Sequence, residues 1–250
     1  MFNIIRDIMN AVIKMRIGVF DSGLGGLTVL EALIKKNPQN EYVYFGDTLN
    51  IPYGDKSKEE LLKLSSKIVK FLESKKVDII VIACGTLSSN VYSELDDLTT
   101  TPIYDILSPT REFLENQKLN NLAVIATEMT IKSGVFGSDI ISIACPKIVP
   151  LIEAGKSDSE EMQKVLEGYL KDKNIDNLVL GCTHYPLVKE QIKKIKPNIN
   201  FIDMGEILAE NLQIEPSKYQ LELYFSSLNE TIKSLVANMF KDYKIEERRL

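Results

Sequence analysis

Short apolar runs rich in Val and Ile alternate along the chain with longer segments that are more polar. The apolar runs are nearly continuous, as in strands buried on both faces, and lie at 17–20, 42–45, 79–83, 122–126, 178–180 and 199–202. Apolar residues recur at helical spacing in the segments 27–36, 58–75 and 159–171. This alternation predicts an α/β fold with mostly parallel sheets.

Two of the apolar runs share a pattern and end on a cysteine. The stretch 77–84 reads VDIIVIAC and the stretch 175–182 reads IDNLVLGC. Segments 16–22 and 121–127 match more loosely, again at an offset of about 100 residues. This repeat favours two similar α/β domains, the first formed by residues 15–107 plus 209–250 and the second by residues 108–208. We expect the segment 226–243 to be helical and to pack on the first domain.

Residues 1–14 form an N-terminal extension before the first predicted strand. Their apolar residues recur at helical spacing and are interrupted by charges, which favours a short amphipathic helix over a secretory signal. The alternative is that translation begins at Met15. No apolar run approaches the roughly 18–20 residues that a membrane span needs. We therefore expect a cytoplasmic protein with no membrane partner.

Charge and cysteine content narrow the expected function. The net charge is −5, and the lysines are scattered among acidic residues. A nucleic-acid partner is not expected, because a basic stripe is missing. The three cysteines, Cys84, Cys145 and Cys182, are too few and too widely spaced for a disulfide framework. His184 is the only histidine, which excludes a mechanism that needs two.

Candidate chemistry lies at the predicted strand ends, where open α/β sheets bind ligands. The glycine-rich stretch 22–27 lacks the spacing of a dinucleotide or P-loop motif. It is compatible with an anion site for a carboxylate, and equally with a plain strand-to-helix turn.

Cys84 and Cys182 are the strongest candidates for chemistry. Each follows a predicted strand and precedes a turn that opens a helix, where amide groups favour a thiolate. Related by the repeat, they would face each other across a cleft. Two facing thiols suit two-base stereoinversion, in which one removes a proton from carbon and the other protonates the opposite face. Zinc bound by both thiols and His184 is the alternative, but the paired spacing of structural zinc sites is missing. Cys145 lies among apolar neighbours and is expected to be a buried hydrophobic residue.

Four blocks resemble the signature blocks of bacterial glutamate racemases. They read IGVFDSGLGG at 17–26, GDT and PYG within 46–54, AC with Thr86 at 83–86, and LGCTHYPL at 180–187. The blocks follow the family's order, and 149–153 also resembles a family segment. The resemblance implies two α/β domains related by a pseudo-twofold axis, with the active site between them. It also implies interconversion of L- and D-glutamate without PLP or metal, D-glutamate supply for peptidoglycan, and a small-molecule substrate. Whether the protein forms a homodimer is left open.

The resemblance further implies roles for individual residues. Cys182 would deprotonate L-glutamate and Cys84 the D-isomer, while Asp21, Glu153 and His184 would tune the thiols. The substrate-binding residues would be Asp21, Ser22, Tyr53, Gly54, Gly85, Thr86, Thr127, Thr183 and His184. Two alternatives stay open: a racemase for aspartate or another acidic amino acid, and a catalytically weakened glutamate-binding protein.

Gly85 is the clearest departure from the family pattern, which has Cys-Asn-Thr where this chain has Cys84-Gly85-Thr86. The missing side chain would remove one contact to a charged substrate group. Such a hydrogen bond is worth about 1.5–3 kcal/mol. We therefore expect Gly85→Asn to raise kcat/KM by about one to two decades.

Overall fold

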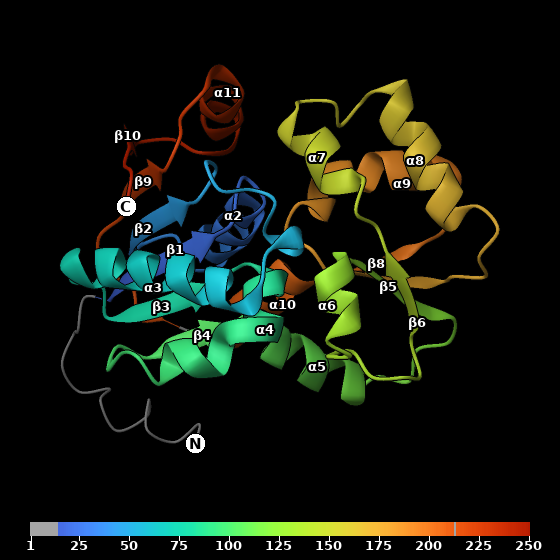
Figure 1. The fold of residues 1–250 in the computed structure, drawn as a ribbon, viewed down its shortest axis with the longest axis horizontal. Helices are drawn as coiled ribbons and strands as arrows, with labels where there is room; N and C mark the ends of the chain where they lie inside the picture. The colour runs from blue at the N-terminus through green and yellow to red at the C-terminus, as the bar shows by residue number, and fades with distance from the viewer. Residues whose placement is uncertain (1–14, 213) are drawn as a thin grey trace.

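The computed structural model describes residues 15–212 and 214–250, and its strands form two parallel sheets. Figure 1 shows these sheets and their helices as the two halves of the molecule. One sheet contains β1 (Arg16–Asp21), β2 (Glu41–Gly46), β3 (Ile79–Ile82), β4 (Ile103–Asp105), β9 (Gln220–Phe225) and β10 (Tyr243–Glu247). The other contains β5 (Leu122–Ala126), β6 (Ile141–Ala144), β7 (Asn177–Leu180) and β8 (Asn200–Asp203). This architecture confirms the predicted α/β class.

Helices follow the strands and cover the sheets, and those at the segments 27–36, 58–75 and 159–171 confirm the predicted helical spacing. Their bounds are α2 (Gly26–Lys36), α3 (Lys58–Ser74), α4 (Gly85–Asp96), α5 (Leu107–Glu115), α6 (Glu128–Lys132), α7 (Ile148–Glu153), α8 (Glu160–Leu170), α9 (Lys189–Ile195), α10 (Met204–Asn211) and α11 (Glu230–Met239). Two short 3-10 helices are η1 (Tyr53–Asp55) and η2 (Tyr185–Val188). The α3 helix begins at a capping box formed by Ser57 and Glu60, and its apolar face is buried.

The strand order reproduces the sequence repeat. In one sheet the first four strands of the chain lie in the order β2-β1-β3-β4, and in the other the next four lie in the order β6-β5-β7-β8. The strands β3 and β7 therefore occupy equivalent places, and each is followed within two residues by a cysteine, Cys84 or Cys182. The two cysteine-bearing loops thus leave equivalent strands of two similarly built sheets.

The C-terminal segment differs from the expected single helix over 226–243. Only Glu230–Met239 is helical, and it connects β9 to β10, which extend the six-stranded sheet beside β2. Strand β9 contains Glu222, and this charged residue interrupts the apolar run that would have predicted a strand. The structure pairs this carboxylate with Arg16 and Lys75.

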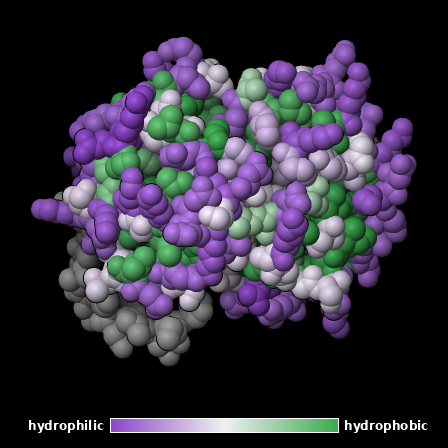
Figure 2. Space-filling view, viewed as in Figure 1, coloured by the Kyte–Doolittle hydropathy of each residue, from purple (hydrophilic) through white to green (hydrophobic). Residues whose placement is uncertain are grey.

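The extension 1–14 lies outside the described residues, so its predicted helix is not tested. No helix within 15–212 and 214–250 has both the length and the apolar character that crossing a membrane requires. On the face drawn in Figure 2, hydrophobic side chains appear as separate patches among hydrophilic ones.

Candidate active site

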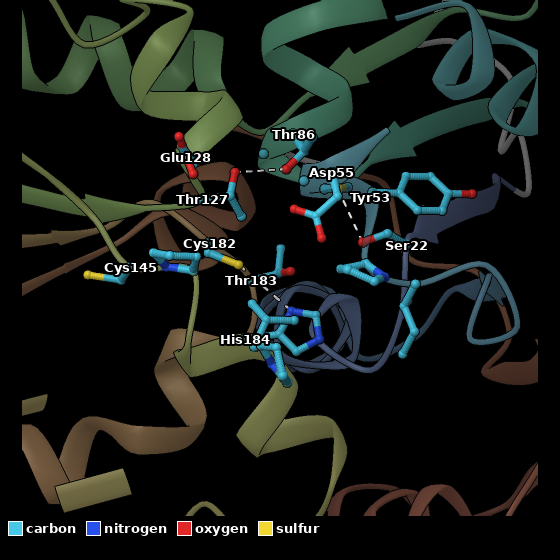
Figure 3. Close-up of a pocket in the computed structure, with 18 of the residues that line it drawn as sticks. Ser22, Tyr53, Asp55, Thr86, Thr127, Glu128, Cys145, Cys182, Thr183 and His184 are labelled. Carbon is cyan, nitrogen blue, oxygen red and sulfur yellow. Dashed lines mark hydrogen bonds between the residues drawn. The ribbon is translucent and has the colours of Figure 1, made fainter. Parts of the chain in front are cut away.

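A small cavity of about 100 Å³ lies between the two halves, where the carboxyl ends of strands from both sheets meet. The six-stranded half contributes Ser22, Tyr53, Gly54, Asp55, Cys84, Gly85 and Thr86 to its wall. The other half contributes Thr127, Glu128, Cys145, Gly181, Cys182, Thr183 and His184. Figure 3 shows many of these side chains around the cavity. Both candidate thiols therefore line one space.

Two helices begin at residues that line this cavity. Cys84 is the N-cap of α4, and Thr127 is the N-cap of α6. None of the described residues that line the cavity is Lys or Arg. Carboxylates bound here would therefore be held by amides, hydroxyl groups and helix N-termini.

Cys84 lies in surroundings that keep its thiol protonated. Its Sγ is buried and donates a hydrogen bond to Ser22 Oγ at 3.5 Å. Burial, together with the charge of Asp21, raises the pKa of the Cys84 thiol to about 12. Burial also raises the pKa of Asp21, against the opposing effects of His184 and of hydrogen bonds from Gly23, Gly26 and Thr183.

Cys182 faces a different group, the imidazole of His184. Its Sγ lies 3.7 Å from His184 Nδ1, and the Nε2 atom of the same ring lies 2.6 Å from Glu153 Oε1. Burial lowers the pKa of His184, but the hydrogen bonds to Cys182 and Glu153 outweigh it and raise this pKa well above its ordinary value. The ring can therefore carry a proton beside the Cys182 sulfur while Glu153 balances its charge.

Hydrogen bonds across the cleft hold the two halves in register at this site. Glu153 Oε1 also accepts from the backbone N–H of Leu24 at 3.0 Å. Thr183 donates to Asp21 Oδ2 at 3.1 Å. The hydroxyl groups of Thr86 and Thr127 lie 3.0 Å apart. Asp21 and Glu153, which stand near the two thiols, are therefore each held by a hydrogen bond from the other half.

Comparison with known proteins identifies the family. The model of the Asp/Glu/Hydantoin racemase family matches residues 27–212. The chain belongs to this family. It is an amino-acid racemase, an isomerase, as the sequence predicts.

Relatives of this racemase cover nearly its whole length. The glutamate racemase of Aquifex aeolicus is 39% identical over 235 residues, which are 89% of this chain and 92% of that protein. Among solved structures, glutamate racemase from Thermus thermophilus, in complex with beta-chloro-D-alanine, is 32% identical with a TM-score of 0.80. The match covers 95% of this chain and 97% of that one. Glutamate racemase from Aquifex pyrophilus is 37% identical with a TM-score of 0.78, over 93% of this chain and 98% of that one.

Most of the site residues predicted for this racemase line the cavity. Asp21 and Glu153 do not, and they reach the cavity through their neighbours Cys84 and His184. Tyr53 lines the cavity with its hydroxyl pointing away from it, and this hydroxyl donates to Asp47 Oδ2 at 2.6 Å (Figure 3).

The structure adds lining residues to which the sequence assigned no role in the site. They are two carboxylates, Asp55 and Glu128, and an apolar wall formed mainly by Cys145, Pro146, Val149 and Pro150. Cys145 is fully buried, as predicted, but it also contributes to this wall. Cys145 directly follows β6, and this position at a strand end would have marked it as a candidate site residue if the short strand had been predicted.

Proposed function

We propose that this racemase interconverts L- and D-glutamate by proton transfer at two thiols, without a cofactor. The observation that carries the proposal is the placement of Cys84 and Cys182 after equivalent strands and on one cavity. The relatives named glutamate racemase support glutamate as the substrate, and one of them, from Francisella tularensis, is described in complex with D-glutamate at 30% identity.

In the L-to-D direction, the Cys182 thiolate removes the α-proton and the Cys84 thiol protonates the opposite face. The raised pKa of Cys84, caused by burial and Asp21, keeps this thiol protonated and ready to donate. After the transfer, Cys182 carries the proton and Cys84 is the thiolate. That state is the one that deprotonates D-glutamate, so the two directions use the same two groups in exchanged roles.

The substrate would be held by groups that suit two carboxylates. Backbone amides of Ser22 and of the turn at Tyr53 and Gly54 come from one half. Hydroxyl groups of Thr86, Thr127 and Thr183 complete the wall, with the last two from the other half. Asp21 acts on the Cys84 thiol and His184 on the Cys182 thiol. The product, D-glutamate, would serve peptidoglycan synthesis.

Circular dichroism of L-glutamate solutions tests the proposed function. Purified protein, dialysed against EDTA and assayed without added cofactor, is expected to remove the optical signal of L-glutamate and, separately, that of D-glutamate. L-aspartate is the matched control substrate and is expected to react much more slowly. Activity that depends on added metal or PLP, or that prefers aspartate, would contradict the proposal.

A further inference from the structure

Asp47 is a buried carboxylate that lies behind the cavity and outside its lining. It follows β2, is 3% exposed, and accepts hydrogen bonds from side chains on both sides. Its Oδ2 accepts from the hydroxyl of Tyr53 at 2.6 Å, and its Oδ1 accepts from the hydroxyl of Ser226 at 2.6 Å. Asn50 donates to both oxygens, at 2.9 and 3.0 Å. A carboxylate with this many donors is tightly fixed.

Ser226 brings the C-terminal strand into this network. It directly follows β9 and is 3% exposed, and its backbone N–H donates to Gly46 O at 3.0 Å. Its hydroxyl oxygen accepts from the backbone N–H of Leu49 at 2.8 Å while its proton goes to Asp47. Ser226 therefore fixes both the carboxylate and the start of the loop that leads to the cavity.

The other arm of the network ends at the cavity wall. Burial and the charge of Asp47 raise the pKa of Tyr53, so its hydroxyl stays protonated and donates. The same residue and Gly54 line the cavity. A Cβ added at Gly54 would lie 3.6 Å from Thr127 Cβ, so this turn faces the other half of the molecule.

We infer that Ser226 and Asp47 are positioning residues that hold the 53–55 turn in place to bind a substrate carboxylate. Neither residue lines the cavity; Asp47 reaches the turn through the Tyr53 hydroxyl, and Ser226 reaches it through Asp47. The inference rests on the proposed function, because the turn's amides are assigned to that substrate. It predicts an effect on substrate binding that is larger than any effect on the proton transfer.

The test compares Ser226→Ala, Tyr53→Phe and the double variant by steady-state kinetics and by calorimetric binding of D-glutamate. Each single variant is expected to raise KM and the Kd of D-glutamate by about tenfold, with kcat changed less than about threefold. The double variant is expected to resemble the single ones, since both substitutions interrupt one chain of hydrogen bonds that runs from Ser226 through Asp47 to Tyr53. Ser65→Ala is the matched control, because Ser65 is also buried but bonds only within α3.

The outcomes separate this inference from the proposed function. Unchanged KM and Kd in a folded Ser226→Ala protein, multiplicative effects in the double variant, or a loss confined to kcat would each overturn the inference alone. Wild-type protein that does not racemise glutamate would overturn the proposed function and the inference with it. If Ser226→Ala fails to fold, Tyr53→Phe carries the same KM test.

Discussion

At the residue scale, the two thiols stand in unequal surroundings. Cys84 is buried beside Ser22 and close to the charge of Asp21, whereas the sulfur of Cys182 faces an imidazole that can carry a proton. The unliganded protein is therefore expected to hold a proton on Cys84, which is the state that receives L-glutamate.

The buried pair of His184 and Glu153 predicts a pH-dependent contribution to stability. Breaking a buried pair costs about 3–5 kcal/mol, and the exposed fractions of these side chains are 2% and 11%. Because the pKa of His184 is raised in the folded protein, the contribution is complete below about pH 6.5 and is lost as the pH rises through the higher folded value. The melting temperatures of wild type and Glu153→Gln, measured by thermal unfolding, should differ most at pH 6. The difference should shrink towards pH 10. A difference that grows with pH would contradict this account.

A side chain added at Gly85 would meet a steric obstacle that the sequence does not reveal. A Cβ at this position would lie 3.0 Å from the carbonyl oxygen of Gly181, the residue before Cys182. We predict that Gly85→Ala lowers kcat/KM by about tenfold, the effect of roughly 1.4 kcal/mol on the barrier. The kcat/KM of Gly85→Asn should exceed that of Gly85→Ala, because Asn adds a substrate contact, but the close approach of its Cβ to the Gly181 carbonyl oxygen should cancel much of the gain expected from sequence. Steady-state kinetics of both variants in both directions test this prediction. A Gly85→Ala variant with the kcat/KM of wild type would refute the predicted clash with the Gly181 carbonyl oxygen.

At the element scale, the turn before α2 must lie against the His184 loop of the other half. A Cβ at Gly25 would lie 2.3 Å from Thr183 Oγ1 and 2.7 Å from the backbone nitrogen of His184. Gly25→Ala is therefore expected to separate these segments and to reduce kcat by about a hundredfold or more.

Gly168→Ala is the matched control for that substitution. Gly168 lies inside α8, and a Cβ there meets nothing within 4 Å. It should leave activity unchanged and stabilise the protein by about 0.5–1 kcal/mol. Equal activity of the two variants in the racemisation assay would show that the close approach at Gly25 is unimportant.

The elements that were predicted from sequence are those with continuous apolar runs or clear helical spacing. The missed strands give weaker signals for particular reasons. β4 has only three residues, β6 exposes Ile141 and Ser142, and β9 carries Glu222 among its apolar residues. The partners that neutralise Glu222 are Arg16 and Lys75, which lie far away in the chain. Tertiary pairing of this kind cannot be seen in a local pattern.

At the scale of the whole molecule, the cysteine-ended repeat predicted two similar halves, and the strand orders agree with it. Most candidate site residues also meet at one cavity. They were chosen because they follow predicted strands, and ligands bind at that edge of an open α/β sheet. The supporting network could not be predicted in this way. Ser226 and Asp47 are 179 positions apart, and no motif links them.

The two-thiol mechanism is tested by α-proton exchange in heavy water with Cys84→Ser and Cys182→Ser. Each variant should lose racemisation, because one thiol cannot protonate the face opposite to the one it serves. Any slow residual exchange should favour opposite isomers, with Cys84→Ser retaining exchange of L-glutamate and Cys182→Ser that of D-glutamate. NMR of each isomer measures both quantities. Near-normal racemisation by either variant would contradict the two-thiol account.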